Sequence, residues 1–95
     1  MPRVVVTPRA VEDLRDLGRA LGLPGGAVAR VQRSLRILER FPYAGRALTG
    51  RWEETRSLIG PWPWMILIYV YDEADDAVFV VAVHDGRSGS SATSR

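Results

Sequence analysis

The sequence has 95 residues, 46% of them hydrophobic and 25% charged, which predicts one soluble globular domain and excludes a disordered or collagen-like chain. It has no cysteine and one histidine, which excludes disulfides, thiolate nucleophiles and cysteine-based zinc sites; no metal or cofactor is expected. The net charge of +2 divides unevenly, with ten arginines and four acids in residues 1–51 but three arginines and seven acids in residues 52–95. This asymmetry suits an acidic partner or phosphates, and a compositional bias of the source genome is the simpler explanation.

No segment of the sequence is long and apolar enough to cross a membrane. The longest apolar run, Trp64 to Tyr71, is far too short for a bilayer, and Met1 leads directly into "PRVVV" without an apolar leader. We therefore expect a cytoplasmic protein with no membrane contact.

The N-terminal stretch "RVVVTP" predicts a short strand followed by a helix. Thr7 is suited to cap the helix and Pro8 to occupy its first turn. Apolar residues then recur at spacings of three and four, at Val11, Leu14, Leu17 and Leu21. Gly22 and the following Leu-Pro end this pattern.

A second helix is predicted after "PGG", and the two helices should form a hairpin. Its apolar stripe consists of Val28, Val31, Leu35 and Leu38, and "FP" at 41 and 42 ends it. The arginines of this helix lie away from the stripe, at positions 30, 33, 36 and 40.

Three strands are expected in the second half of the chain. Residues 52–60 form a weak strand pattern, whereas residues 64–71 and 77–84 are rich in β-branched and aromatic side chains and flank the polar loop "DEADD". Residues 1–87 are expected to form the domain and residues 88–95 a flexible tail rich in serine and glycine.

This order predicts an α+β fold in which a two-helix hairpin packs on one face of a four-stranded, mainly antiparallel sheet (β-α-α-β-β-β). Both faces of the last two strands are apolar. In one strand the side chains of Met65, Leu67 and Tyr69 should point to one face and those of Ile66, Ile68 and Val70 to the other. In the second strand Val78, Val80 and Ala82 should point to one face and Phe79, Val81 and Val83 to the other. Two helices cover one face only, so we expect another polypeptide on the other face, with a homodimer or the tail as alternatives.

Four stretches, in this order, resemble the RelE/ParE superfamily of toxins from bacterial type II toxin-antitoxin modules. They are "TPRAVEDL", "ILERFPYAGRAL", "TRSLIGPWPWMILIYVY" and "VFVVAVHDGR", and the resemblance covers residues 3–87. It implies a small α+β toxin, associated with growth inhibition and plasmid stabilisation, that is neutralised by a cognate antitoxin lying across it.

The superfamily contains ribosome-dependent mRNA endonucleases similar to RelE and inhibitors of DNA gyrase similar to ParE. This chain has Met65 where the nucleases place an arginine, and it lacks the aromatic residue of the RelE tail. If the chain is a nuclease, the resemblance implies that Arg56, His84 and Arg87 are the catalytic residues. Each has a simpler structural explanation: an ion pair for each arginine, and a strand-edge position for His84.

Six aromatic and arginine side chains are expected to contact the antitoxin or another partner, because tryptophan, tyrosine and arginine are frequent at binding hot spots. They are Trp62, Trp64, Tyr69, Tyr71, Arg30 and Arg33. Core packing for the aromatic residues and a solvated helix face for the arginines are the alternatives.

The leading hypothesis is a ParE-like toxin that inhibits DNA gyrase by protein-protein contact. Its rivals are a RelE-like endonuclease acting on mRNA at the ribosome, and an inactive toxin-like interaction module.

Overall fold

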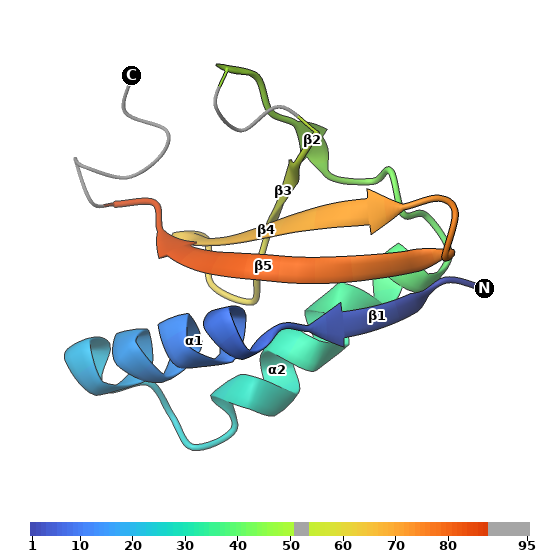
Figure 1. The fold of residues 1–95 in the computed structure, drawn as a ribbon. Helices are drawn as coiled ribbons and strands as arrows, with labels where there is room; N and C mark the ends of the chain where they lie inside the picture. The colour runs from blue at the N-terminus through green and yellow to red at the C-terminus, as the bar shows by residue number, and fades with distance from the viewer. Residues whose placement is uncertain (51–53, 88–95) are drawn as a thin grey trace.

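The computed structural model describes residues 1–50 and 54–87, which form two helices, a short 3-10 helix and five strands (Figure 1). The strands are β1 (Arg3–Val6), β2 (Arg46–Ala47), β3 (Arg56–Ile59), β4 (Met65–Asp72) and β5 (Ala77–Asp85). The helices are α1 (Pro8–Leu21), α2 (Ala27–Ser34) and the 3-10 helix η1 (Leu35–Glu39). The expected tail, residues 88–95, and the start of the expected strand at 52 and 53 lie outside the described residues.

The five strands form one mixed sheet in the order β1-β5-β4-β3-β2. Strand β1 pairs in parallel with β5, and the other three pairings are antiparallel. The α+β class and the β-α-α-β-β-β order are confirmed, but the expected number of four strands is wrong. The additional strand, β2, has only two residues, which is too short to produce a periodic pattern.

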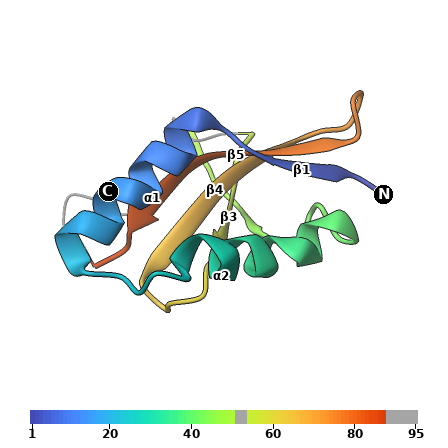
Figure 2. The ribbon, with the colours of Figure 1, turned by 90° about the horizontal axis from the view of Figure 1, so that it is seen from below.

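Both helices lie on the same face of the sheet and diverge from the connection at residues 22–26 (Figure 2). Helix α1 begins where the sequence predicts: the Thr7 side chain caps it by accepting a hydrogen bond from the Ala10 N–H, and Gly22 follows its last residue. Between the helices and the sheet lies the core, whose fully buried members include Leu38, Met65, Leu67, Tyr69, Val78 and Val80.

The second helical segment is shorter and tighter than expected. The α-helix ends at Ser34 and continues as a 3-10 helix, a common arrangement at helix ends. Val31, Leu35 and Leu38 are buried as expected, but Val28 is 54% exposed. Ala27 takes the buried position instead, since it lies one turn before Val31 on the same side of the helix.

Strand β5 contains a β-bulge that changes which side chains face the core. Ile68 pairs with Ala82 and Tyr69 with Val80, so Val81 is the extra residue. Val83 consequently joins the core and pairs with Leu67. The expected alternation, with Ala82 on the face of Val80 and Val83 on the face of Phe79, is therefore wrong.

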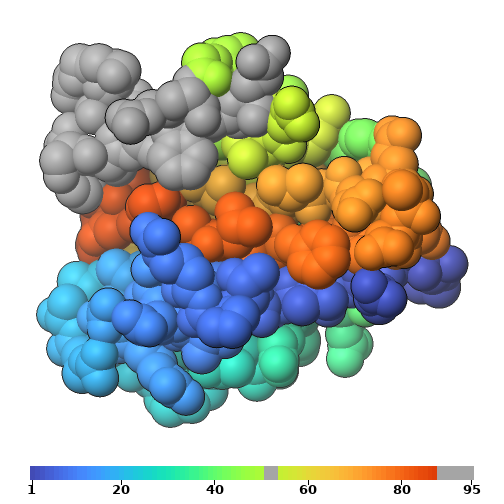
Figure 3. Space-filling model, viewed as in Figure 1, coloured from blue at the N-terminus to red at the C-terminus, as the bar shows by residue number. Residues whose placement is uncertain are grey.

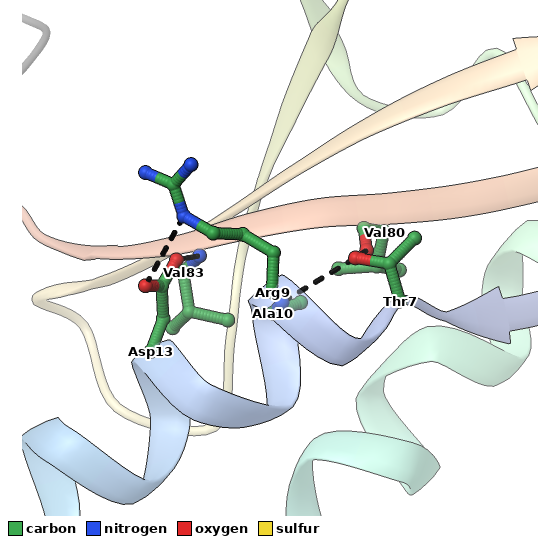
Figure 4. A network of polar contacts seen from close by, with 6 residues as sticks. All are labelled: Thr7, Arg9, Ala10, Asp13, Val80 and Val83. Carbon is green, nitrogen blue, oxygen red and sulfur yellow. Dashed lines mark hydrogen bonds and ion pairs between the residues drawn. The ribbon is translucent and has the colours of Figure 1, made fainter.

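The start of α1 holds β5 on both sides of this bulge (Figure 4). The Thr7 hydroxyl donates to the Val80 carbonyl at 2.8 Å, and one Asp13 carboxylate oxygen accepts from the Val83 N–H at 3.1 Å. Along the surface drawn in Figure 3, α1 continues the line of β1 beside β5. Asp13 thus replaces the strand partner that β5 lacks beyond the end of β1.

The face of the sheet away from the helices is apolar and only partly covered. On this face Ile68 is buried, Ile66, Val70 and Phe79 are half-buried, and Ile59 is 58% exposed.

Candidate functional site

Four of the candidate site residues meet at the end of the sheet where β5 finishes. The guanidinium of Arg30, on α2, lies 4.5 Å from the centroid of the Trp62 ring. The guanidinium of Arg87, just after β5, lies 4.6 Å from the centroid of the Trp64 ring. The two tryptophan rings are nearly parallel, with centroids 6.1 Å apart. We call these four residues the Arg-Trp cluster. Both tryptophans are partly buried against the core, so the cluster combines rim packing with an outward cationic surface.

Backbone contacts position Trp64 and Arg87 beside each other. The Gly86 N–H donates to the Trp64 carbonyl at 2.6 Å. A Cβ at position 86 would lie 2.8 Å from a methyl carbon of Ile66, so only glycine fits there without a shift of that side chain. The chain therefore passes close enough to β4 for Arg87 to reach the indole ring.

Arg87 is also paired with Asp85. Its Nε lies 3.1 Å from one carboxylate oxygen and its Nη2 3.2 Å from the other. The Arg87 side chain, together with its backbone N–H, holds the pKa of the Asp85 carboxyl below its ordinary value, and the same pair raises the pKa of the guanidinium. Asp85 therefore takes up hydrogen-bond donors on the Nε and Nη2 atoms of Arg87.

Arg56 lies on the helix side of β3, paired with Tyr69, and binds the backbone of the loop after η1. Its Nη1 donates to the carbonyls of Gly45 at 2.8 Å and Tyr43 at 3.2 Å, and its guanidinium lies 5.0 Å from the Tyr43 ring centroid. These contacts give Arg56 a structural role, and among the described residues the ion pair expected for it with an acid is not found.

Tyr69 is fully buried, so it is not on the surface where a partner would touch it. Its hydroxyl donates to the Pro42 carbonyl at 2.9 Å and accepts from the Gly45 N–H at 2.8 Å. Burial raises the pKa of the Tyr69 phenol, and the hydrogen bond from Gly45 and the charge of Arg56 partly oppose this effect.

Tyr71 lies at the other end of β4 from Trp64 and is half-buried. Its ring meets that of Tyr43 edge to face, with centroids 5.2 Å apart, and its hydroxyl donates to Asp76 at 2.7 Å. This hydrogen bond raises the pKa of Tyr71. The Tyr43 hydroxyl contacts the carboxylate of Glu73, so aromatic and acidic groups gather beside the β4-β5 turn.

Two of the three residues expected to be catalytic in a nuclease, Arg56 and His84, lie on opposite faces of the sheet. His84 is half-buried and pairs with Ile66, which places it on the sheet face opposite the one that carries Arg56. Met65, at the position where the nucleases have an arginine, is completely buried in the core. Within residues 1–50 and 54–87, no group of three or more His, Asp or Glu side chains is arranged to hold a metal ion.

Sequence reasoning missed one surface, formed by Ile37, Phe41 and Tyr43, which are 46%, 60% and 50% exposed. The feature of the sequence that could have indicated this surface is Ile37, an apolar residue outside the apolar stripe of its helix. Arg33, on α2, is exposed as the helix pattern predicts.

Comparisons with solved structures show the same fold in bacterial toxins. The toxin-antitoxin complex RelBE2 from Mycobacterium tuberculosis includes a chain with 25% identity and a TM-score of 0.69, and the match covers 90% of this chain and 99% of that one. The intact E. coli RelBE complex matches with 17% identity and a TM-score of 0.66, covering 90% and 96%. The isolated E. coli RelE toxin matches with 16% identity and a TM-score of 0.66, covering 95% and 89%.

The comparison with curated proteins found no match. In the described part of the chain, none of the helices combines the length and the apolar character that a membrane crossing requires. The family model for the ParE toxin of the type II toxin-antitoxin system parDE matches residues 4–88. Because this match spans nearly the whole chain, the protein belongs to the ParE toxin family.

Proposed function

We propose that this toxin inhibits DNA gyrase through protein-protein contact and is held inactive in the cytoplasm by a cognate antitoxin. The observation that carries the proposal is the match to the ParE family over residues 4–88, since the ParE branch of the superfamily acts on gyrase. The complexes of RelBE2 and RelBE are toxins solved together with their antitoxins, which supports a bound antitoxin here by analogy.

The geometry supports gyrase inhibition over RNA cleavage. A ribonuclease needs cations aimed at one phosphate and a proton-transferring group beside them. Here Arg56 donates to two backbone carbonyls, Arg87 is paired with Asp85, and His84 is on the opposite sheet face from Arg56. The buried Met65 supplies no charge in place of the missing arginine.

The partner contacts that we propose are centred on the Arg-Trp cluster. Trp62, Trp64 and Arg30 form a preorganised aromatic and cationic surface, and Arg33 extends it along α2. Tyr71 contributes at the far end of β4, and buried Tyr69 contributes by supporting the loop after η1.

Two assays test this function: gyrase supercoiling with the purified chain, and mapping of transcript ends in cells that express the chain without antitoxin. We expect the wild-type chain to inhibit supercoiling and leave transcripts intact, and His84→Ala to behave in the same way. Arg19→Ala is the control, since Arg19 is exposed on the surface of α1 and, among the described residues, its ion pair is with Asp16.

Cleaved transcripts with normal supercoiling, with the cleavage abolished by His84→Ala or Arg87→Ala, would assign the chain to the RelE-like endonucleases instead. Normal growth with neither effect would identify an inactive interaction module. Coexpression of the polypeptide encoded next to the toxin gene should restore growth if that polypeptide is the antitoxin.

A further inference from the structure

Ile37, Phe41 and Tyr43 form an apolar surface that the Arg-Trp cluster does not include. We call these three residues the Phe41 platform. With 46%, 60% and 50% of their surfaces exposed, they border a depression of about 540 Å³ whose lining is Ile37, Arg40, Phe41, Pro42, Tyr43 and Ala44. Single exposed apolar side chains are ordinary, but several gathered within seven residues mark a contact surface.

The backbone beneath the platform is held firmly by the sheet. The Tyr69 hydroxyl bonds the Pro42 carbonyl and the Gly45 N–H, and Arg56 bonds the carbonyls of Tyr43 and Gly45. Four hydrogen bonds from β3 and β4 thus fix a loop whose apolar side chains point outward. A preorganised surface loses little conformational entropy when it binds a partner.

The charges around the platform define the chemistry of that partner. Arg40 is the one charged residue in the lining of the depression. Arg30, Arg33 and Arg36 are exposed on the same helical segment, which runs from the Trp62 ring to the platform. Glu73, from the β4-β5 turn, contacts the Tyr43 hydroxyl. A complementary segment therefore carries carboxylates on the helix side and apolar side chains at the platform.

The chain's own acidic segment does not match this description. Residues 72–76, "DEADD", have alanine as their only apolar member, so a second copy would bring charge without the large side chains that the platform needs. This favours a separate polypeptide.

We propose that the Phe41 platform docks an acidic amphipathic segment of the antitoxin, with its apolar side chains on Phe41 and its carboxylates along the arginines of α2 and η1. The proposal rests on the proposed function, because it assigns a surface to the antitoxin named there. It adds a contact at the opposite end of the sheet from Trp64, near the β4-β5 turn (Figures 1 and 2).

The test measures binding of the purified antitoxin, encoded next to the toxin gene, to the full-length toxin and to three surface variants. We expect Phe41→Ala and Arg40→Glu each to raise the dissociation constant about tenfold or more, as for hot-spot residues. Arg40→Glu should also weaken the salt dependence of binding. Leu21→Ala is the control: Leu21 is an apolar side chain that is 40% exposed at the end of α1, outside the platform and the Arg-Trp cluster. Amide hydrogen exchange should show protection of residues 36–44 in the complex, and circular dichroism confirms that each variant is folded.

Three results would overturn the proposal. In the first, wild type binds the antitoxin and both platform variants bind equally well, which excludes the platform from the antitoxin interface and leaves the proposed function intact. In the second, wild type binds no antitoxin, which contradicts both the role of the platform and the antitoxin part of the proposed function. In the third, the isolated toxin forms a dimer that Phe41→Ala dissociates, which assigns the platform to a second copy.

Discussion

Arg87 shows how one side chain is held by two different forces. It forms a bidentate ion pair with Asp85 and lies over the Trp64 ring. An exposed ion pair alone contributes little to stability, but here a hydrogen bond from the Gly86 N–H to the Trp64 carbonyl holds the backbone before Arg87, and the guanidinium lies over the indole ring.

Removal of the Arg87 side chain should be visible in the titration of Asp85. Because Arg87 is the main cause of the lowered pKa of the Asp85 carboxyl, Arg87→Ala should raise this pKa toward its ordinary value. The change is partial, since the backbone N–H of residue 87 still donates to the carboxylate. Carboxyl chemical shifts measured by NMR as a function of pH report it, and an unchanged pKa for Asp85 in the variant would refute the assignment.

The sign of the pH effect follows from the direction of this shift. A lowered pKa means that the folded state favours the carboxylate, so the contribution of Asp85 to stability is present above the unfolded pKa. It is lost as the pH falls through the folded value.

At the scale of elements, the join between α1 and β5 is the most informative contact. Strand β1 ends at Val6, and beyond it the described part of the chain supplies no strand neighbour to β5 on that side. Thr7 and Asp13 supply the missing hydrogen bonds on either side of the bulge at Val81 (Figure 4). Arg9 lies 3.6 Å from the other Asp13 oxygen and keeps the carboxylate oriented.

Asp13→Ala should therefore destabilise the fold by about 1–3 kcal/mol, the cost of leaving a part-buried N–H without its acceptor. Urea unfolding measures the loss, and the Val83 amide should exchange with solvent faster. Asp16→Ala is the matched control on the same helix, because the Asp16 side chain is 62% exposed and forms a surface ion pair with Arg19; its effect should stay within about 0.5 kcal/mol. Equal effects of the two substitutions would mean that Asp13 has no special role at the bulge.

At the scale of the whole molecule, Tyr69 connects the sheet to the loop that carries the Phe41 platform. The hydroxyl is the only part of the side chain that makes these bonds, so Tyr69→Phe keeps the core volume and removes both of them. We expect a loss of about 1–3 kcal/mol in the free energy of unfolding, mostly from the buried Gly45 N–H left without its acceptor.

The stability of the whole chain should also depend on Tyr69 at alkaline pH. Burial raises the pKa of Tyr69 above the ordinary value of 10.0, so the unfolded state loses its proton first. The stability that Tyr69 contributes is complete below that value and is lost as the pH rises through the folded pKa. The pKa of Tyr71 is also raised, so Tyr69→Phe should reduce the loss of stability at alkaline pH without abolishing it. An identical pH profile for wild type and Tyr69→Phe in urea unfolding would contradict this account.

Local patterns along the sequence determined the element order, the N-cap at Thr7, the two long strands and the one-sided helix layer, because periodicity and capping act between near neighbours. The tertiary structure alone decided the bulge at Val81, which moves Val83 into the core, and the two-residue strand β2. It also decided the roles of Arg56 and Tyr69, which bind a loop 11 to 27 residues away in sequence. The physical reason is the same in each case. A hydrogen bond across the fold depends on which backbone groups remain without partners after the elements pack, and no spacing in the sequence records that.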